Sequence, residues 1–301
     1  MHPLRSVLIF LVVVFLGGAL VAPAAYLLVQ AAMPGSWLAQ HPFHRYMNRA
    51  FLGLALISIW PLLRGLGATS WRELGLVSGG GRTGFIDWRR LGAGFVLGMI
   101  SLACVAILAV GMHGRQLNPD LTLARLTGGV AGAAGTAIIV AVIEEVLFRG
   151  ALFGGLRRFW DWRAALLLSS MAYAIMHFME NVRAEGPVTW TSGLEFLPRM
   201  LRGFGDWQVV IPGFFNLTLA GILLGLAYQR TGNLYFSIGL HAGWIFWRVS
   251  YGLLTVPVVA ANAWFWGTQK LTDGWLALGI LALTLMVMSL MLPPRMVEKP
   301  S

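Results

Sequence analysis

Long apolar segments separated by short polar connections constrain this chain more than any other feature of its sequence. A helix needs about 20 mainly apolar residues to cross a bilayer. Charged residues make up only 11% of the 301 residues, which is too few to cover a water-facing surface. The sequence therefore predicts an all-α, polytopic integral membrane protein with about eight transmembrane helices. The expected segments are 6–29, 51–66, 91–111, 126–156, 164–179, 207–229, 234–254 and 275–292.

The net charge of +10 does not indicate a nucleic-acid partner. Lys and Arg lie mostly in the short connections, and no basic stripe interleaved with aromatic residues is present. More of them flank the membrane side that carries the N-terminus, which predicts that both termini are cytoplasmic. We expect the plasma membrane as the location, membrane lipid as a partner, and one membrane domain over 1–301, because no polar linker divides the chain.

Three ionisable residues interrupt the fourth apolar segment: Glu144, Glu145 and Arg149. Each costs roughly 2.5–3.5 kcal/mol in a membrane helix unless something compensates it. Glu145 and Arg149 are four residues apart, so they share a helix face and predict a buried ion pair. Glu144 lies about 100° around the helix, without that partner, and suits the role of a general base. A purely structural role for the three residues in joining helices is the alternative.

Two histidines, His177 and His241, also fall in apolar segments. Glu144 lies roughly 18 Å before the end of its helix, and His177 lies roughly 21 Å into the next helix, so both reach a similar depth from one turn. His241 lies roughly 12 Å beyond the turn at 230–233. The spacing predicts a cavity that holds one glutamate and two histidines. These three side chains could also form a zinc site with an open position, although the sequence has no HExxH motif.

Glycines at four-residue or similar spacing predict close helix packing in two segments. One set lies in the first half of the glutamate-bearing segment and the other in the sixth segment. The residues are Gly128, Gly132 and Gly135, and Gly221 and Gly225.

Three short motifs follow one another in the fourth, fifth and seventh segments. They are Glu144-Glu145 with Arg149, Tyr173 with His177, and His241 with Ile245. Their order and spacing resemble the EExxxR, FxxxH and HxxxN (or HxxxD) motifs of the CPBP (Abi) intramembrane protease family, which includes the type II CAAX prenyl endopeptidases. The resemblance extends over about 136–247, and it implies a catalytic core at about 126–254, in the fourth to seventh helices.

The resemblance implies an intramembrane endopeptidase that hydrolyses a peptide bond of a membrane-associated or prenylated substrate. Glu144 and His177 would position and deprotonate a water molecule, and Glu145 with Arg149 would support them. His241 would stabilise the oxyanion. This glutamate mechanism needs no cofactor, and the alternative is a zinc peptidase that uses Glu144, His177 and His241 as ligands.

Ile245 departs from the family pattern, because isoleucine cannot donate the side-chain hydrogen bond of Asn. Losing one oxyanion donor typically costs about 100- to 1,000-fold in rate. Trp244 or Arg248 could supply a replacement donor. The departure keeps two other functions open: an inactive relative that acts as a membrane scaffold or peptide-binding regulator, and a transporter with Glu144 and Arg149 in its path.

Overall fold

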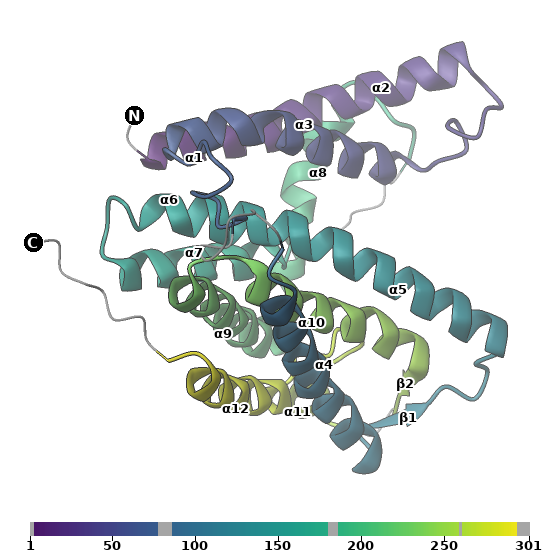
Figure 1. Ribbon diagram of the computed structural model, residues 1–301. Helices are drawn as coiled ribbons and strands as arrows, with labels where there is room; N and C mark the ends of the chain where they lie inside the picture. Colours follow the sequence, from purple (N-terminus) through teal and green to yellow (C-terminus); the bar gives the residue numbers. More distant parts are fainter. Residues whose placement is uncertain (1–2, 78–85, 180–185, 259–260, 294–301) are drawn as a thin grey trace, which may run out of the picture. The chain divides into compact units, whose positions relative to one another are not determined.

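The computed structural model describes residues 3–77, 86–179, 186–258 and 261–293 (Figure 1). Within these ranges the chain is helical apart from two short antiparallel strands, and a helix lies at each of the eight expected segments. The helices are α1 (Pro3–Val12), η1 (Val13–Gly17), α2 (Gly18–Ala32), α3 (Phe43–Gly65), α4 (Trp88–Gly111), α5 (Leu123–Glu144), η2 (Glu145–Phe153), α6 (Gly154–Leu156), α7 (Trp162–Met176), α8 (Ser192–Met200), η3 (Leu201–Phe204), α9 (Trp207–Thr231), α10 (Tyr235–Leu254), α11 (Ala263–Trp266) and α12 (Trp275–Met291). The strands are β1 (Arg115–Leu117) and β2 (Thr255–Pro257).

Five helical stretches of the described residues are long and apolar enough to cross a membrane. α7 and α12 are apolar but shorter, and the 20-residue α10 is not among the five. The expected class of an all-α membrane protein is confirmed, whereas the number of eight crossings stays a prediction. The five stretches are Leu4–Ala32, Phe43–Gly65, Trp88–Gly111, Leu123–Leu156 and Trp207–Thr231.

Contacts group the chain into two compact units, which are described separately. Unit 1 comprises Met1–Thr69 and Met176–Asp206, and unit 2 comprises Ser70–Ile175 and Trp207–Ser301. In unit 1, α2, α3 and α8 bury a common apolar cluster. Its fully enclosed members are Ala19, Ala22, Phe43, Met47, Phe196 and Met200. The expectation of one membrane domain over the whole chain stays a prediction.

In unit 2, α10 lies between α4, α5 and α9 (Figure 1). Glycines on both helices bring the backbones of α4 and α10 into direct contact. A Cβ atom at Gly94 would lie 2.1 Å from the Phe236 carbonyl oxygen, and one at Gly239 would lie 2.0 Å from the Leu91 carbonyl oxygen. Since no side chain fits there, this contact fixes the rotation of α10 about its axis and with it the direction of His241.

The expected packing role of the other glycines is confirmed for α9 and wrong for α5. A Cβ atom at Gly221 would lie 2.7 Å from the Ser170 side chain, and one at Gly225 would lie 2.3 Å from Leu166, so both glycines admit α7. On α5, added Cβ atoms would find no described atom within 4 Å. These three positions are Gly128, Gly132 and Gly135.

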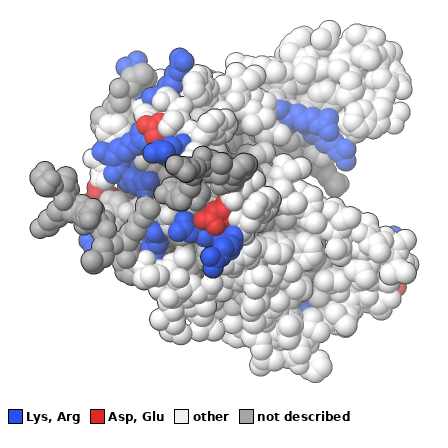
Figure 2. All heavy atoms as spheres, in the orientation of Figure 1, with Lys and Arg blue, Asp and Glu red and all other residues white. Residues whose placement is uncertain are grey.

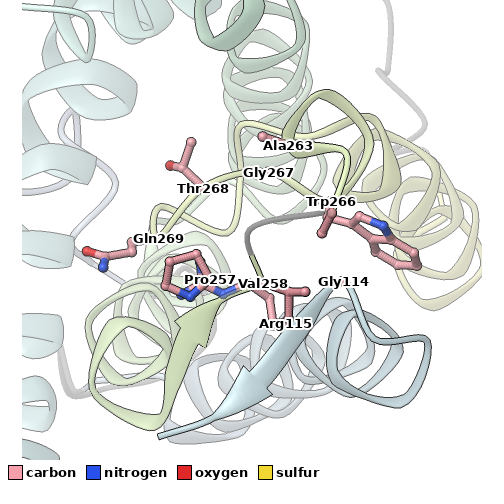
Figure 3. Close-up of a pocket in the computed structure, with 10 residues that line it drawn as sticks. Gly114, Arg115, Pro257, Val258, Ala263, Trp266, Gly267, Thr268 and Gln269 are labelled. Carbon is pink, nitrogen blue, oxygen red and sulfur yellow. The ribbon is translucent and has the colours of Figure 1, made fainter.

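Strand β2 directly follows α10 and pairs with β1, Arg115 lying opposite Pro257. The buried Arg115 guanidinium donates hydrogen bonds to the Thr255 hydroxyl and carbonyl oxygens, at 3.1 to 3.2 Å. A pocket of about 200 Å³ lies beside this pair, with Trp266 and Gly267 in its wall (Figure 3). The strand pair therefore holds the C-terminal end of α10.

Candidate active site

The fourth apolar segment changes its helix type at the paired glutamates. Glu144 is the last residue of α5, and the nine residues Glu145–Phe153 form the π-helix η2. The helix expected over 126–156 is confirmed as one helical stretch, Leu123–Leu156, although its geometry changes from α to π at Glu145. A π-helix is rare and often marks a functional site. Apolar periodicity does not reveal it, because the segment is apolar on either side of the charged residues.

The predicted ion pair between Glu145 and Arg149 is confirmed. Arg149 Nη1 lies 2.8 Å from Glu145 Oε1, and the two side chains are 3% and 0% exposed. The guanidinium also lies over the Tyr173 ring of α7, with Cζ 4.4 Å from the ring centroid. Pairing and stacking together compensate the burial of the two charges.

His241 of α10 contacts both glutamates. Its Nδ1 lies 2.8 Å from Glu145 Oε1, the oxygen that also accepts from Arg149. A carboxylate paired with arginine only accepts hydrogen bonds, so Nδ1 carries a proton and donates to Glu145 Oε1. Nε2 lies 3.7 Å from Glu144 Oε2. Glu145 thus orients the imidazole toward Glu144, a role that sequence reasoning missed because it paired Glu145 with Arg149 alone.

The hydroxyl group of Tyr173 lies close to His241 Nε2. Its Oη lies 3.2 Å from His241 Nε2, and its ring packs edge-on against Phe148, with centroids 5.1 Å apart. When Nδ1 alone carries the ring proton, Nε2 accepts this hydrogen bond and the phenol donates it. Sequence reasoning treated Tyr173 as one aromatic residue in place of another and missed the added hydroxyl, although the replacement of Phe by Tyr was the signal.

His177 does not lie in a helix, contrary to the expected segment 164–179. α7 ends at Met176, and His177 occupies the turn that follows. Polar residues begin at Glu180, so little apolar sequence remains to extend the helix. His177 falls in unit 1 and Glu144 in unit 2, so their expected meeting stays a prediction.

Trp244, Ile245 and Arg248, near the third motif, differ in their burial and in their contacts. The indole N–H of Trp244 donates a 2.8 Å hydrogen bond to the Ser101 hydroxyl of α4, so the one donor of this side chain is engaged. Arg248 is exposed. Ile245 is buried in an apolar cluster that includes Ala137 and Ala141 of α5. The engaged indole N–H speaks against Trp244 as the expected replacement donor, and the role of Arg248 stays a prediction.

The expected zinc ligands do not form a set among the described residues. No group of three or more His, Cys, Asp or Glu side chains in these ranges is arranged to hold a metal ion. Glu144 and His241 are near each other, but His177 belongs to the other unit. The zinc alternative therefore stays a prediction.

An apolar pocket of about 480 Å³ lies between α4, α5 and α10. Its wall includes Val142, two residues before Glu144, and Ala242, which follows His241. Phe95 and Phe246 add aromatic surface. This volume is in the range of pockets that bind small molecules.

A family model described as Type II CAAX prenyl endopeptidase Rce1-like matches residues 126–247. No curated protein and no solved structure matches the chain. The match covers less than half of the chain. The matched segment holds all three motifs and is similar to the CAAX prenyl endopeptidases, so the resemblance seen in the motifs is confirmed over these residues.

Proposed function

We propose that this chain is an intramembrane endopeptidase that hydrolyses a peptide bond of a membrane-associated substrate with water activated by Glu144. The contact of His241 with both glutamates supports the proposal most directly. It unites the first and third motifs at one place within the segment that the family model matches.

Glu144 is the general base in this proposal. Its side chain is 25% exposed, whereas that of Glu145 is fully buried and engaged by Arg149 and His241. Glu144 can therefore receive a water molecule, and Glu145 cannot. Glu144 accepts a proton from water as the water oxygen adds to the peptide carbonyl carbon. When the C–N bond breaks, Glu144 returns that proton to the leaving nitrogen.

Tyr173 is the oxyanion donor in this proposal, in place of the side chain that Ile245 lacks. The Tyr173 hydroxyl donates to His241 Nε2, and rotation about its C–O bond turns the O–H toward a carbonyl oxygen bound beside that nitrogen. Until a substrate binds, His241, held by Glu145, positions the hydroxyl through this hydrogen bond. His177 keeps the role that the family resemblance implies for it, as a partner of Glu144 in positioning water.

We further propose that the substrate carries an apolar modification such as a prenyl chain. The apolar pocket of about 480 Å³ between α4, α5 and α10 supports this, because its apolar wall suits such a chain and two of its helices, α5 and α10, also carry Glu144 and His241. Both termini would lie in the cytoplasm, as the distribution of Lys and Arg indicates, and we propose the plasma membrane as the location.

Cleavage by the purified protein in liposomes tests the proposal. Matched prenylated and unprenylated peptides are incubated with wild type, with Glu144→Gln, and with Glu195→Gln as a control at an exposed glutamate of α8. We expect cleavage of the prenylated peptide by wild type and the control only. Full activity of Glu144→Gln would exclude it as the base, and loss of wild-type activity with a zinc chelator would favour the zinc alternative. A folded protein that cleaves no peptide would favour the alternative of an inactive relative that acts as a membrane scaffold.

A further inference from the structure

A polar cavity of about 700 Å³ lies in unit 2, and neither Glu144 nor Glu145 lines it. Arg157 is one of its lining residues and follows Glu144 by roughly 20 Å along the helix axis. The charged residues in its wall are Arg72, Glu73, Arg157, Arg158, Arg163 and Arg230. We call this cavity the arginine pocket. Its charges play no part in the proposed hydrolysis.

Arg157 and Arg230 are fixed in the pocket wall. Arg157 Nη1 donates a 2.7 Å hydrogen bond to Gln229 Oε1, and its guanidinium lies over the Tyr228 ring at 4.5 Å. Burial lowers the pKa of the Arg157 guanidinium, and the neighbouring charge of Arg158 also lowers it. Arg230 Nη1 donates to the Leu292 carbonyl oxygen at 2.8 Å. Two cations are thus held in place before any ligand binds.

The other charged residues of the wall leave the pocket strongly positive. Arg72 and Arg163 are exposed. Arg158 Nη2 lies 3.8 Å from Glu73 Oε1, and both side chains are about a third exposed, so this pair is weak. Among the described residues of the wall, Glu73 is the one acidic side chain, against five arginines. An anion bound here would reduce the repulsion between these cations.

Helix ends place the pocket at the level of lipid headgroups. α6 ends at Leu156, α7 begins at Trp162, and α9 ends at Thr231. Apolar segments that end together beside a tryptophan are typical of a membrane interface. Figure 2 shows the basic side chains gathered in a few clusters, with broad uncharged areas between them.

We propose that the arginine pocket binds the phosphate group of an anionic phospholipid. Guanidinium groups match phosphate oxygens with paired hydrogen bonds, and basic pockets between membrane helices bind phosphorylated headgroups. The sequence predicts that this end of the helices faces the cytoplasm, where the leaflet carries anionic lipid. Binding does not depend on peptide hydrolysis, so it can be tested independently of the proposed function.

Native mass spectrometry of the whole protein in neutral detergent tests the proposal, with phosphatidylglycerol and phosphatidylcholine titrated separately. The variant Arg158→Gln with Arg163→Gln removes two exposed charges and leaves the contacts of Arg157 and Arg230 intact. The control is Arg89→Gln with Arg125→Gln, which removes the same charge at exposed positions outside the pocket. We expect tighter binding of phosphatidylglycerol to wild type, and roughly 30-fold weaker binding to the pocket variant, at about 5-fold per arginine.

The control variant should bind phosphatidylglycerol as wild type does. Equal losses in the two double variants would show that general charge attraction, and not the pocket, holds the lipid, and would overturn the proposal. Equal binding of the two lipids by wild type would overturn it as well. Inorganic phosphate is the third arm: if millimolar phosphate displaces the lipid completely, the pocket is a site for free phosphate and the assignment to a phospholipid fails.

Discussion

Replacing Tyr173 with phenylalanine removes one hydroxyl group and keeps the ring. The ring packs against Phe148 and carries the Arg149 guanidinium, so both contacts survive in Tyr173→Phe. The loss is the 3.2 Å hydrogen bond to His241 Nε2 and, during hydrolysis, the proposed donor to the oxyanion. This variant therefore separates a chemical role of Tyr173 from a packing role.

The expected effects of Tyr173→Phe on kcat and on stability follow from the two roles of the hydroxyl group. An oxyanion donor typically contributes about 100- to 1,000-fold to kcat, so Tyr173→Phe should lose that much, with little change in KM. A buried hydrogen bond between neutral groups contributes only about 1 kcal/mol to the free energy of unfolding, so the fold should persist. The large effect on kcat beside a small effect on stability is the signature of the proposed role.

A matched control is present in the same unit. The Tyr228 hydroxyl donates a hydrogen bond of the same length, 3.2 Å, to the Glu73 carbonyl oxygen. Tyr228→Phe should therefore lose similar stability and no activity. The assay is cleavage of a prenylated peptide in liposomes, with the thermal midpoint in detergent measured for each variant. Wild-type kcat in Tyr173→Phe, from a protein that cleaves the peptide, would refute the assignment of the oxyanion donor.

Three further substitutions test other parts of the structure. Arg149→Ala should lower the free energy of unfolding by about 3–5 kcal/mol, because it leaves the buried Glu145 carboxylate without its cation; an unchanged thermal midpoint would contradict the pair. Ile245→Asn should lower the midpoint, since it buries an amide in an apolar cluster, and should change kcat little if Tyr173 already serves; a large gain in cleavage would favour a missing donor instead. Gly98→Ala places a Cβ atom 2.2 Å from a backbone oxygen of α10 and should destabilise the protein, whereas Gly132→Ala, with open space around it, should stabilise it by up to about 1 kcal/mol; equal midpoints would refute the role of the glycine contact.

The sequence predicted those features that depend on neighbours along the chain. The apolar segments coincide with helices because a run of apolar residues needs only its own length and composition to form one. The pair of Glu145 with Arg149 was predicted for the same reason, since a spacing of four residues brings two side chains together on one helix. The motif order alone pointed to the endopeptidase family, and the family model agrees over 126–247.

Only the tertiary structure decided which faces of the helices meet. Glycines at similar spacing occur on α5 and α4. Nothing in the spacing shows that Gly94 and Gly98 of α4 contact α10, whereas Gly128, Gly132 and Gly135 of α5 face open space. The contact between Glu145 and His241 joins residues far apart in the chain. It therefore forms only when η2 and α10 are each rotated about their axes so that these two side chains face each other. The Tyr173 hydroxyl acquires its proposed role in the same way. The sequence specifies which chemical groups the side chains carry. The packing of the helix backbones determines which of these groups contact each other.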